Sequence, residues 1–172
     1  IENRSQFVTK IVEAVRSRVS DNFIVGLRFS QWKQHDFNAK LANSPQELEK
    51  IILPPVNAGL DYLHSSMRRF WESEFSDSDE NLAYWTKKIS NIVTIGVGSV
   101  GLDTDFIDMM ASANSTSIDK AIEDISKDKY ELIAVGRALI ADPEWVIKMK
   151  EGRLEDLIPV SYTHLRAHET ES

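Results

Sequence analysis

Hydrophobic residues along this chain alternate between helical spacing and short apolar runs. Four-residue spacing of Phe7, Ile11, Val15 and Val19 places these side chains on one face of an amphipathic helix. Ser44 followed by Pro45 and Glu47 is typical of a helix start, and that helix is expected to end near Asn57–Gly59. Together, the helical patterns predict helices over residues 4–19, 45–57, 82–89, 104–127 (one or two helices) and 142–158.

Short β-rich runs separate these helical segments. They predict four strands, over residues 23–30, 60–66, 91–98 and 130–136, of which the first has the continuous apolar character of a buried strand. Strands that alternate with helices indicate an α/β protein whose parallel sheet is joined by helical crossovers. Ligands of such folds bind at the carboxyl ends of the strands, so the residues just after each strand are the candidates for function.

Composition narrows the class of protein. The 172 residues are 42% hydrophobic and 27% charged, which is ordinary for a globular domain. A net charge of −7 argues against a nucleic-acid partner, and the absence of cysteine excludes disulfides and thiolate metal sites. No apolar run approaches the ~20 residues of a membrane helix. We expect a cytoplasmic protein that binds neither nucleic acid nor membrane; the start at Ile1 leaves open whether a leader precedes it.

The third predicted strand ends in a glycine motif. Gly96, Gly98 and Gly101 in "VTIGVGSVGL" form G-x-G-x-x-G, which can bring backbone N–H groups close to a phosphate. In a dinucleotide-binding Rossmann unit the next strand ends in an acidic residue, roughly 20 residues on. Here that strand ends about thirty residues later in Gly136–Arg137, although an arginine could also accept the 2′-phosphate of NADP. Two successive strand ends with glycine match the shared phosphate site of a (β/α)₈ barrel better.

The first two strands end in basic and aromatic residues. Arg28 lies inside the first strand, where it needs an anionic or electron-rich ligand, or a structural carboxylate. His64 in the second strand has the position of an ordinary histidine at the edge of the core. Arg68, Arg69 and Trp71 follow it and either cover a ligand or belong to a solvated loop.

Several segments in this order resemble the old yellow enzyme family of FMN-dependent oxidoreductases. The matching segments are "IENRSQF", "VGLRFS", "GLDYLHSS", "RRFWESEF", "TIGVGSVGL" and "LIAVGRALIADPEWVIKMKEGR". The resemblance covers residues 1–159 and implies the second half of a TIM (β/α)₈ barrel, its strands five to eight. It further implies an enzyme that takes hydride from NADH or NADPH onto FMN and passes it to an activated alkene such as an enone.

The resemblance also implies roles for individual residues. Arg28 is expected at the pyrimidine edge of the flavin, Gly98 and Ser99 at the FMN phosphate, and Gly136 with Arg137 on the same phosphate. His64, Arg68, Arg69 and Trp71 fall where family members vary their substrate contacts. The paired His/His or His/Asn and the tyrosine proton donor of the family precede the segment that matches residue 1, so no catalytic residue is assigned.

The last residues depart from the family pattern. His164 and His168, with Glu169 beside them, have a spacing that can bind zinc on a helix. However, "VSYTHLRAHET" is also the translation of a transposon-type sequencing adapter. We therefore expect residues 160–172 to be a non-native tail and predict no metal site.

Three functional hypotheses remain open at this point. The first is the FMN-dependent oxidoreductase, of which this chain is a fragment that is inactive by itself; whether the parent is a homo-oligomer stays open. The second is a Rossmann-type NAD(P)-binding domain built on the 96–101 motif. The third is a non-catalytic half-barrel, because four parallel strands leave two unpaired edges, from which we expect aggregation or dimerisation and poor FMN binding.

Overall fold

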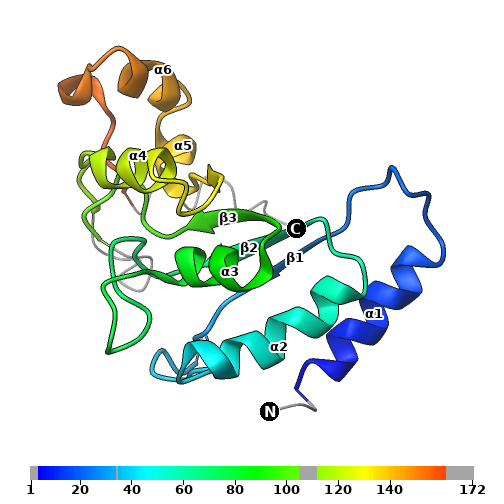
Figure 1. The fold of residues 1–172 in the computed structure, drawn as a ribbon. Coiled ribbons are helices and arrows are strands. Elements are labelled where there is room, and N and C mark those ends of the chain that lie inside the picture. Colours follow the sequence, from blue (N-terminus) through cyan, green and yellow to red (C-terminus); the bar gives the residue numbers. More distant parts are fainter. Residues whose placement is uncertain (1–3, 34, 105–111, 162–172) are drawn as a thin grey trace.

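The chain forms a four-stranded parallel sheet whose strands pair in chain order. In the computed structural model, which describes residues 4–33, 35–104 and 112–161, the order is β1-β2-β3-β4 (Figure 1). The strands are β1 (Gly26–Phe29), β2 (Tyr62–Ser66), β3 (Val93–Val97) and β4 (Leu132–Ile133). The helices are α1 (Gln6–Arg16), α2 (Pro45–Asn57), α3 (Leu82–Ser90), α4 (Asp119–Ser126), α5 (Arg137–Ala141) and α6 (Trp145–Lys150), followed by the 3₁₀ turn η1 (Leu154–Asp156). The predicted α/β alternation and the parallel sheet are confirmed.

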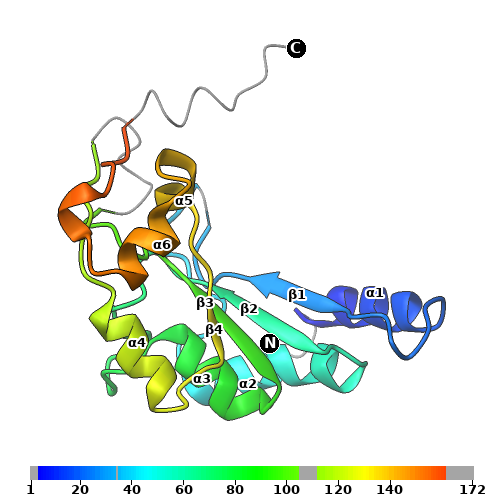
Figure 2. The same cartoon turned by 90° about the horizontal axis from the view of Figure 1, so that it is seen from above.

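The two faces of the sheet have different surroundings. Leu63 and Ser65 of β2 and Thr94 of β3 are fully buried on the face that α2 and α3 cover (Figure 2). The alternate residues point to the opposite face, where they are half-buried or exposed. Parallel register aligns Arg28, His64 and Ile95 across this second face. All four strands consequently direct their carboxyl ends to one edge of the sheet.

Capping residues set the boundaries of α2 and α3. Ser44 caps α2 by accepting a hydrogen bond from the Glu47 N–H at 3.2 Å. Asn81 caps α3 in the same way, accepting from the Tyr84 N–H at 2.9 Å. Asn91 ends α3 in the left-handed region, with φ 55°. These caps fix where the loops that lead to the strands begin and end.

Two expectations about burial are wrong. The first strand is short and half-exposed rather than buried, with Phe23 and Ile24 before it 55% and 70% exposed, because β1 is an edge strand that pairs with β2 alone among the described strands. In α1, Phe7 is 75% exposed and Ile11 also faces solvent. The helix packs on α2 and turns Val12 into the core instead.

The C-terminal part is more broken than its sequence pattern suggests. Instead of one helix over 142–158, the chain forms α6, a turn and η1, because Gly152 adopts φ +71° and interrupts the helix. The predicted helical span 104–127 is wrong over residues 112–118, which form no helix and pair through bridges at Ala113 and Ser115; within this span the described residues form only α4, and residues 105–111 lie outside the described part. Val160 pairs with Ala113 and is buried. The tail assignment stays a prediction, because residues 162–172, with His164 and His168, also lie outside the described part.

Candidate functional site

A hollow of about 320 Å³ lies at the carboxyl ends of the four strands. We call it the strand-end hollow. Its lining contains all five residues that the sequence assigned to a cofactor, namely Arg28, Gly98, Ser99, Gly136 and Arg137. It further includes Trp32, Ser66, Met67, Arg68, Val97, Val100 and Leu102. Its volume falls in the range of small-molecule and cofactor sites.

The turn after β3 forms one wall of this hollow. A Cβ at Gly98 would lie 2.8 Å from the carbonyl oxygen of Met67, so this position accepts only glycine without a shift of backbone. Ser99 follows in the left-handed region, with φ 49°, which is uncommon for a residue with a side chain. The close approach of the two loops is held by the Met67 N–H, which donates to the Val97 carbonyl at 2.7 Å.

Arg137 joins the turns that follow β3 and β4. It begins α5 directly after Gly136 and donates through Nη2 to Ser99 Oγ at 3.2 Å and to the Thr104 carbonyl at 2.7 Å. Ser99 Oγ in turn donates to the Arg68 carbonyl, 3.0 Å away, in the loop after β2. One hydroxyl therefore connects three strand ends. A Cβ on Gly136 would meet no protein atom within 4 Å, so the space beside this glycine is open.

Arg28 reaches the same hollow from β1. The expectation that it lies in a buried strand is wrong, because β1 is an edge strand and Arg28 is exposed. Its Nη2 donates to Ser66 Oγ at 3.1 Å, which holds the guanidinium across the end of β2. Burial, together with the charge of Arg28, lowers the pKa of neighbouring His64 and so favours its neutral form.

Three arginines bring positive charge to the described wall of the hollow. Arg28, Arg68 and Arg137 line it, and no aspartate or glutamate is among the described residues of its wall. Guanidinium groups offer five N–H donors in a planar fork that matches phosphate oxygens. A phosphomonoester linked to a planar group that becomes anionic when reduced would balance this charge. The lining thus has the chemistry that the FMN assignment requires.

The four residues of the predicted substrate loop are separated by the structure. Arg68 lines the strand-end hollow and also an adjoining cavity of about 170 Å³, to which Arg69 contributes. Arg69 pairs there with Glu72 at 2.7 Å. Trp71 instead lines a third hollow, beside Phe70, and His64 contributes to neither the strand-end hollow nor the adjoining cavity.

Sequence reasoning missed Trp32, Ser66 and Met67, which line both the strand-end hollow and the adjoining cavity. Their signal was available, because each follows or ends a predicted strand. A polar Ser66 at the end of a β-rich run and an isolated tryptophan in the polar loop 31–43 are signals that could have indicated a site at the strand ends.

The glycine motif does not build a Rossmann site in this chain. A Rossmann sheet has strands out of chain order, whereas β1 to β4 pair consecutively. Gly101, with φ +72°, is followed by Leu102, which bridges to Ser115 rather than opening a helix. The next helix of the described residues is α4, which begins at Asp119.

Comparison with known proteins agrees with this topology. The sequence profile of the NADH:flavin oxidoreductase / NADH oxidase family matches residues 1–156. The chain belongs to this family. It is 29% identical over 165 residues to an NADH oxidase of Thermoanaerobacter brockii, and 25% identical over 163 residues to an NADH:fumarate oxidoreductase of Klebsiella pneumoniae (strain 342). These alignments cover 91% and 88% of the chain but 22% and 15% of the relatives, so this flavin oxidoreductase chain spans a small part of their length.

Solved structures show the same fold. The old yellow enzyme of Trypanosoma cruzi matches with a TM-score of 0.59 at 18% identity, over 87% of this chain and 34% of that one. Morphinone reductase in complex with tetrahydroNAD also matches with a TM-score of 0.59, at 17% identity, over 87% of this chain and 34% of that one. The predicted second half of a TIM barrel, with an open parallel sheet, is therefore confirmed.

Metal clusters and membrane-spanning helices are both absent from the described part of this chain. Within residues 4–33, 35–104 and 112–161, no group of three or more His, Asp or Glu side chains has the arrangement of a metal site. No described helix combines the length and apolar character needed to cross a bilayer.

Proposed function

We propose that this chain forms the FMN-phosphate half of an NAD(P)H-dependent oxidoreductase that reduces activated alkenes of the enone type. The observation that carries the proposal is the junction at Ser99 Oγ, where Arg137 from the β4 turn meets the β3 turn at 3.2 Å. Strand-end turns that share one anion are the phosphate site of a (β/α)₈ barrel. The family profile supports the flavin and the dinucleotide as cofactors.

Each residue has a defined part in binding. Gly98 and Gly136 let backbone approach the phosphate, Ser99 orients the guanidinium of Arg137, and Arg137 supplies the opposing charge. Bound FMN would supply hydride transfer between NADH or NADPH and an electron-poor carbon–carbon double bond. Arg28 places positive charge at the pyrimidine edge of the ring, where negative charge develops on reduction. We assign no proton donor to this chain.

The proposal includes a cytoplasmic location, since the electron donor is a dinucleotide of that compartment. It also leaves the parent protein as a possible homo-oligomer and the isolated chain as a weak FMN binder. The four-stranded sheet supports the last point, because both of its edge strands lack a neighbour among the described residues.

Flavin titration tests the phosphate site directly. We expect FMN to bind the chain at least tenfold more tightly than riboflavin, which has the same ring and ribityl chain but no phosphate. Equal affinity for the two flavins would contradict the proposal. Turnover is tested by placing this chain in the corresponding segment of the Thermoanaerobacter brockii NADH oxidase, which keeps the preceding part of the barrel. We expect NADH-dependent reduction of 2-cyclohexenone by that chimera, and an enone left intact while NADH is consumed would exclude alkene reduction.

A further inference from the structure

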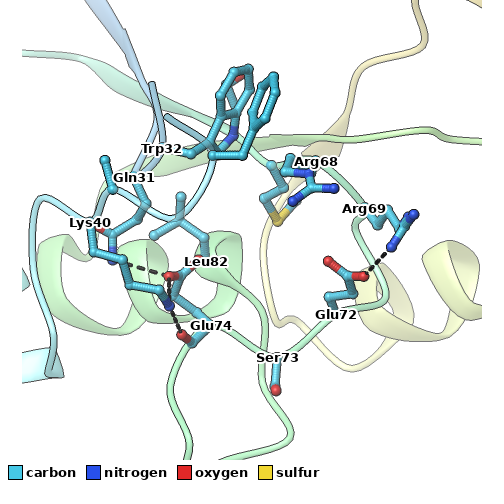
Figure 3. Close-up of a pocket in the computed structure, with 13 residues that line it drawn as sticks. Gln31, Trp32, Lys40, Arg68, Arg69, Glu72, Ser73, Glu74 and Leu82 are labelled. Atoms are coloured by element: carbon cyan, nitrogen blue, oxygen red, sulfur yellow. Dashed lines mark hydrogen bonds and ion pairs between the residues drawn. The ribbon is translucent and has the colours of Figure 1, made fainter. Parts of the chain in front are cut away.

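A carboxylate joins the loop after β1 to the loop after β2. Glu74 Oε1 accepts hydrogen bonds from Gln31 Nε2 at 3.1 Å and from Lys40 Nζ at 2.9 Å. Lys40 Nζ also donates to the Glu74 carbonyl at 2.7 Å. Figure 3 shows the Lys40 side chain directed at Glu74. We call the side chains of Gln31, Lys40 and Glu74 the loop clasp.

The loop clasp closes the base of the loop 31–43, which the structure describes apart from residue 34. The Gln31 side chain is buried and bonds the backbone of Ala42 twice, donating to its carbonyl at 3.0 Å and accepting from its N–H at 2.9 Å. Trp32 directly follows Gln31 in the chain. Contacts that fix Gln31 therefore also fix the backbone from which the Trp32 side chain extends.

Glu74 itself is anchored to the helix beside it. The Glu74 N–H donates to the Glu80 carbonyl at 2.9 Å, just before α3 begins. Phe75, the next residue, is buried, and its ring lies edge-on to Trp85 of α3 with the ring centroids 5.8 Å apart. The loop clasp therefore ties a surface loop to a helix that packs on the sheet.

Trp32 connects the loop clasp to the strand-end hollow. Trp32 is half-buried and lines this hollow, whereas Glu74 is not among the described residues of its wall. The indole also packs against Phe37 of the same loop, with ring centroids 5.8 Å apart. An indole offers a flat apolar face on which planar rings stack. The effect of Glu74 on a ligand of the hollow is consequently indirect.

Stability does not explain why a charged residue stands at position 74. The Glu74 side chain is only 14% exposed. Burial raises the pKa of its carboxyl, and the contacts with Lys40 and Gln31, which lower this pKa, do not offset the effect of burial. The ionised carboxyl is thus less favourable in the fold than in water. Buried ion pairs of this kind are best attested where they fix one arrangement of the neighbouring elements.

We propose that Glu74 is a positioning residue of the strand-end hollow: through the loop clasp it sets the place of Trp32, whose indole packs against a planar ring ligand. Because the indole is held before the ligand arrives, less entropy is lost on binding. The identity of the ring as the flavin rests on the proposed function, since that function places FMN in this hollow. The link from Glu74 to Trp32 does not depend on the proposed function.

Fluorine NMR on the whole chain tests the link between Glu74 and Trp32. With 5-fluorotryptophan in place of the four tryptophans, each signal is assigned by replacing one tryptophan with phenylalanine. We expect Glu74→Gln and Lys40→Gln to move the Trp32 signal in the same direction, because either change removes the ion pair. The Trp145 signal of α6 should stay. Glu123→Gln, which removes a carboxylate paired with an exposed lysine of α4, is the matched control and should move neither signal. A Trp32 signal that stays in both clasp variants would overturn the proposal.

A conservative variant and a double variant separate the ion pair from a general loss of structure. Lys40→Arg keeps the cation and should retain the Trp32 signal of the unaltered chain. The double variant Glu74→Gln with Lys40→Gln should displace this signal no further than either single change, because all three lack the same ion pair. An additive displacement, or a Lys40→Arg signal displaced as far as that of Lys40→Gln, refutes the ion pair as the cause. Should Glu74→Gln fail to fold, the Lys40 variants still decide the question, because the Lys40 side chain is 42% exposed.

Flavin affinity tests what the position of Trp32 does. We expect Glu74→Gln to weaken FMN and riboflavin by the same factor, at least fivefold, because the indole meets the ring that both flavins share. Glu123→Gln should leave both affinities within twofold. A displaced Trp32 signal with unchanged affinity for both flavins refutes the ring contact. Equal affinity of the unaltered chain for FMN and riboflavin, alongside a displaced Trp32 signal in Glu74→Gln, refutes the proposed phosphate site alone.

Discussion

Replacing Arg137 with alanine tests the phosphate site at its one charged contact from the β4 turn. Arg137 is half-buried, and its Nη2 is held by Ser99 Oγ at 3.2 Å and the Thr104 carbonyl at 2.7 Å. The side chain is therefore oriented before any ligand arrives. The variant removes a preorganised cation from the hollow and leaves Arg28, the proposed contact of the flavin ring, in place.

The expected loss follows from the strength of charge-assisted hydrogen bonds. Such bonds contribute about 1.5–3 kcal/mol, and the half-exposed position of Arg137 favours the lower part of that range, about 1.5–2 kcal/mol. Since 1.4 kcal/mol is a factor of ten, FMN affinity should fall roughly 10–30-fold. Riboflavin affinity should change less than twofold, because riboflavin has no phosphate for Arg137 to bind.

Quenching of flavin fluorescence in parallel titrations with FMN and riboflavin measures both affinities. Arg153→Ala is the matched control, because Arg153 pairs with Glu151 and Asp156 outside the strand-end hollow. The reasoning is refuted if Arg137→Ala weakens the two flavins by the same factor, since the arginine would then act on the ring or on the fold.

Three further outcomes follow from the packing and charges of the chain. Gly98→Ala brings a Cβ to 2.8 Å from the Met67 carbonyl, so the urea midpoint should fall by an amount equal to about 1–3 kcal/mol, and an unchanged midpoint contradicts the close approach. Lys148 Nζ lies 2.8 Å from the buried Asp142 carboxylate, and Lys148→Met leaves this carboxylate without its cation. Urea unfolding should show a loss of about 3–5 kcal/mol in the free energy of unfolding, and a loss below about 1 kcal/mol argues against the ion pair. Burial alone would raise the pKa of the Asp142 carboxyl, but the Lys148 ammonium and two backbone N–H groups hold this pKa below its usual value. The resulting stabilisation is complete above the unfolded-state pKa and is lost as the pH falls through the folded-state pKa, so Asp142→Asn should flatten the decline of stability at acid pH. An unaltered decline in this variant excludes the Asp142 carboxyl as its source.

The sequence pattern predicts the order of the elements in this protein better than it predicts which residues are buried. The caps at Ser44 and Asn81 depend on neighbours within three residues, so helix boundaries are written locally. Burial of β1 and of Phe7 depends on what pairs with the sheet edge and covers α1, which no local pattern contains. The helical spacing over residues 142–158 predicts a continuous helix, whereas the positive φ of Gly152 ends it.

The candidate site divides in the same way. Glycines and arginines just after strands could be assigned to one place, because parallel strands bring their carboxyl ends together. Ser99 was expected to offer backbone to a phosphate, yet its hydroxyl also connects Arg137 to the Arg68 carbonyl. Such a contact joins residues 31 and 38 positions apart, and only the folded chain shows it. The adjoining cavity of about 170 Å³ could not be predicted either, since two separate loops build it.

The left-handed turn at Ser99 has a consequence for how ligands affect one another. Its hydroxyl accepts from Arg137, the proposed phosphate ligand, and donates to the carbonyl of Arg68, which lines both the strand-end hollow and the adjoining cavity. A ligand that orders Arg137 therefore also orders Ser99 and the backbone at Arg68. In an oxidoreductase built on this segment, binding of the cofactor would order part of the adjoining cavity before the second reactant binds.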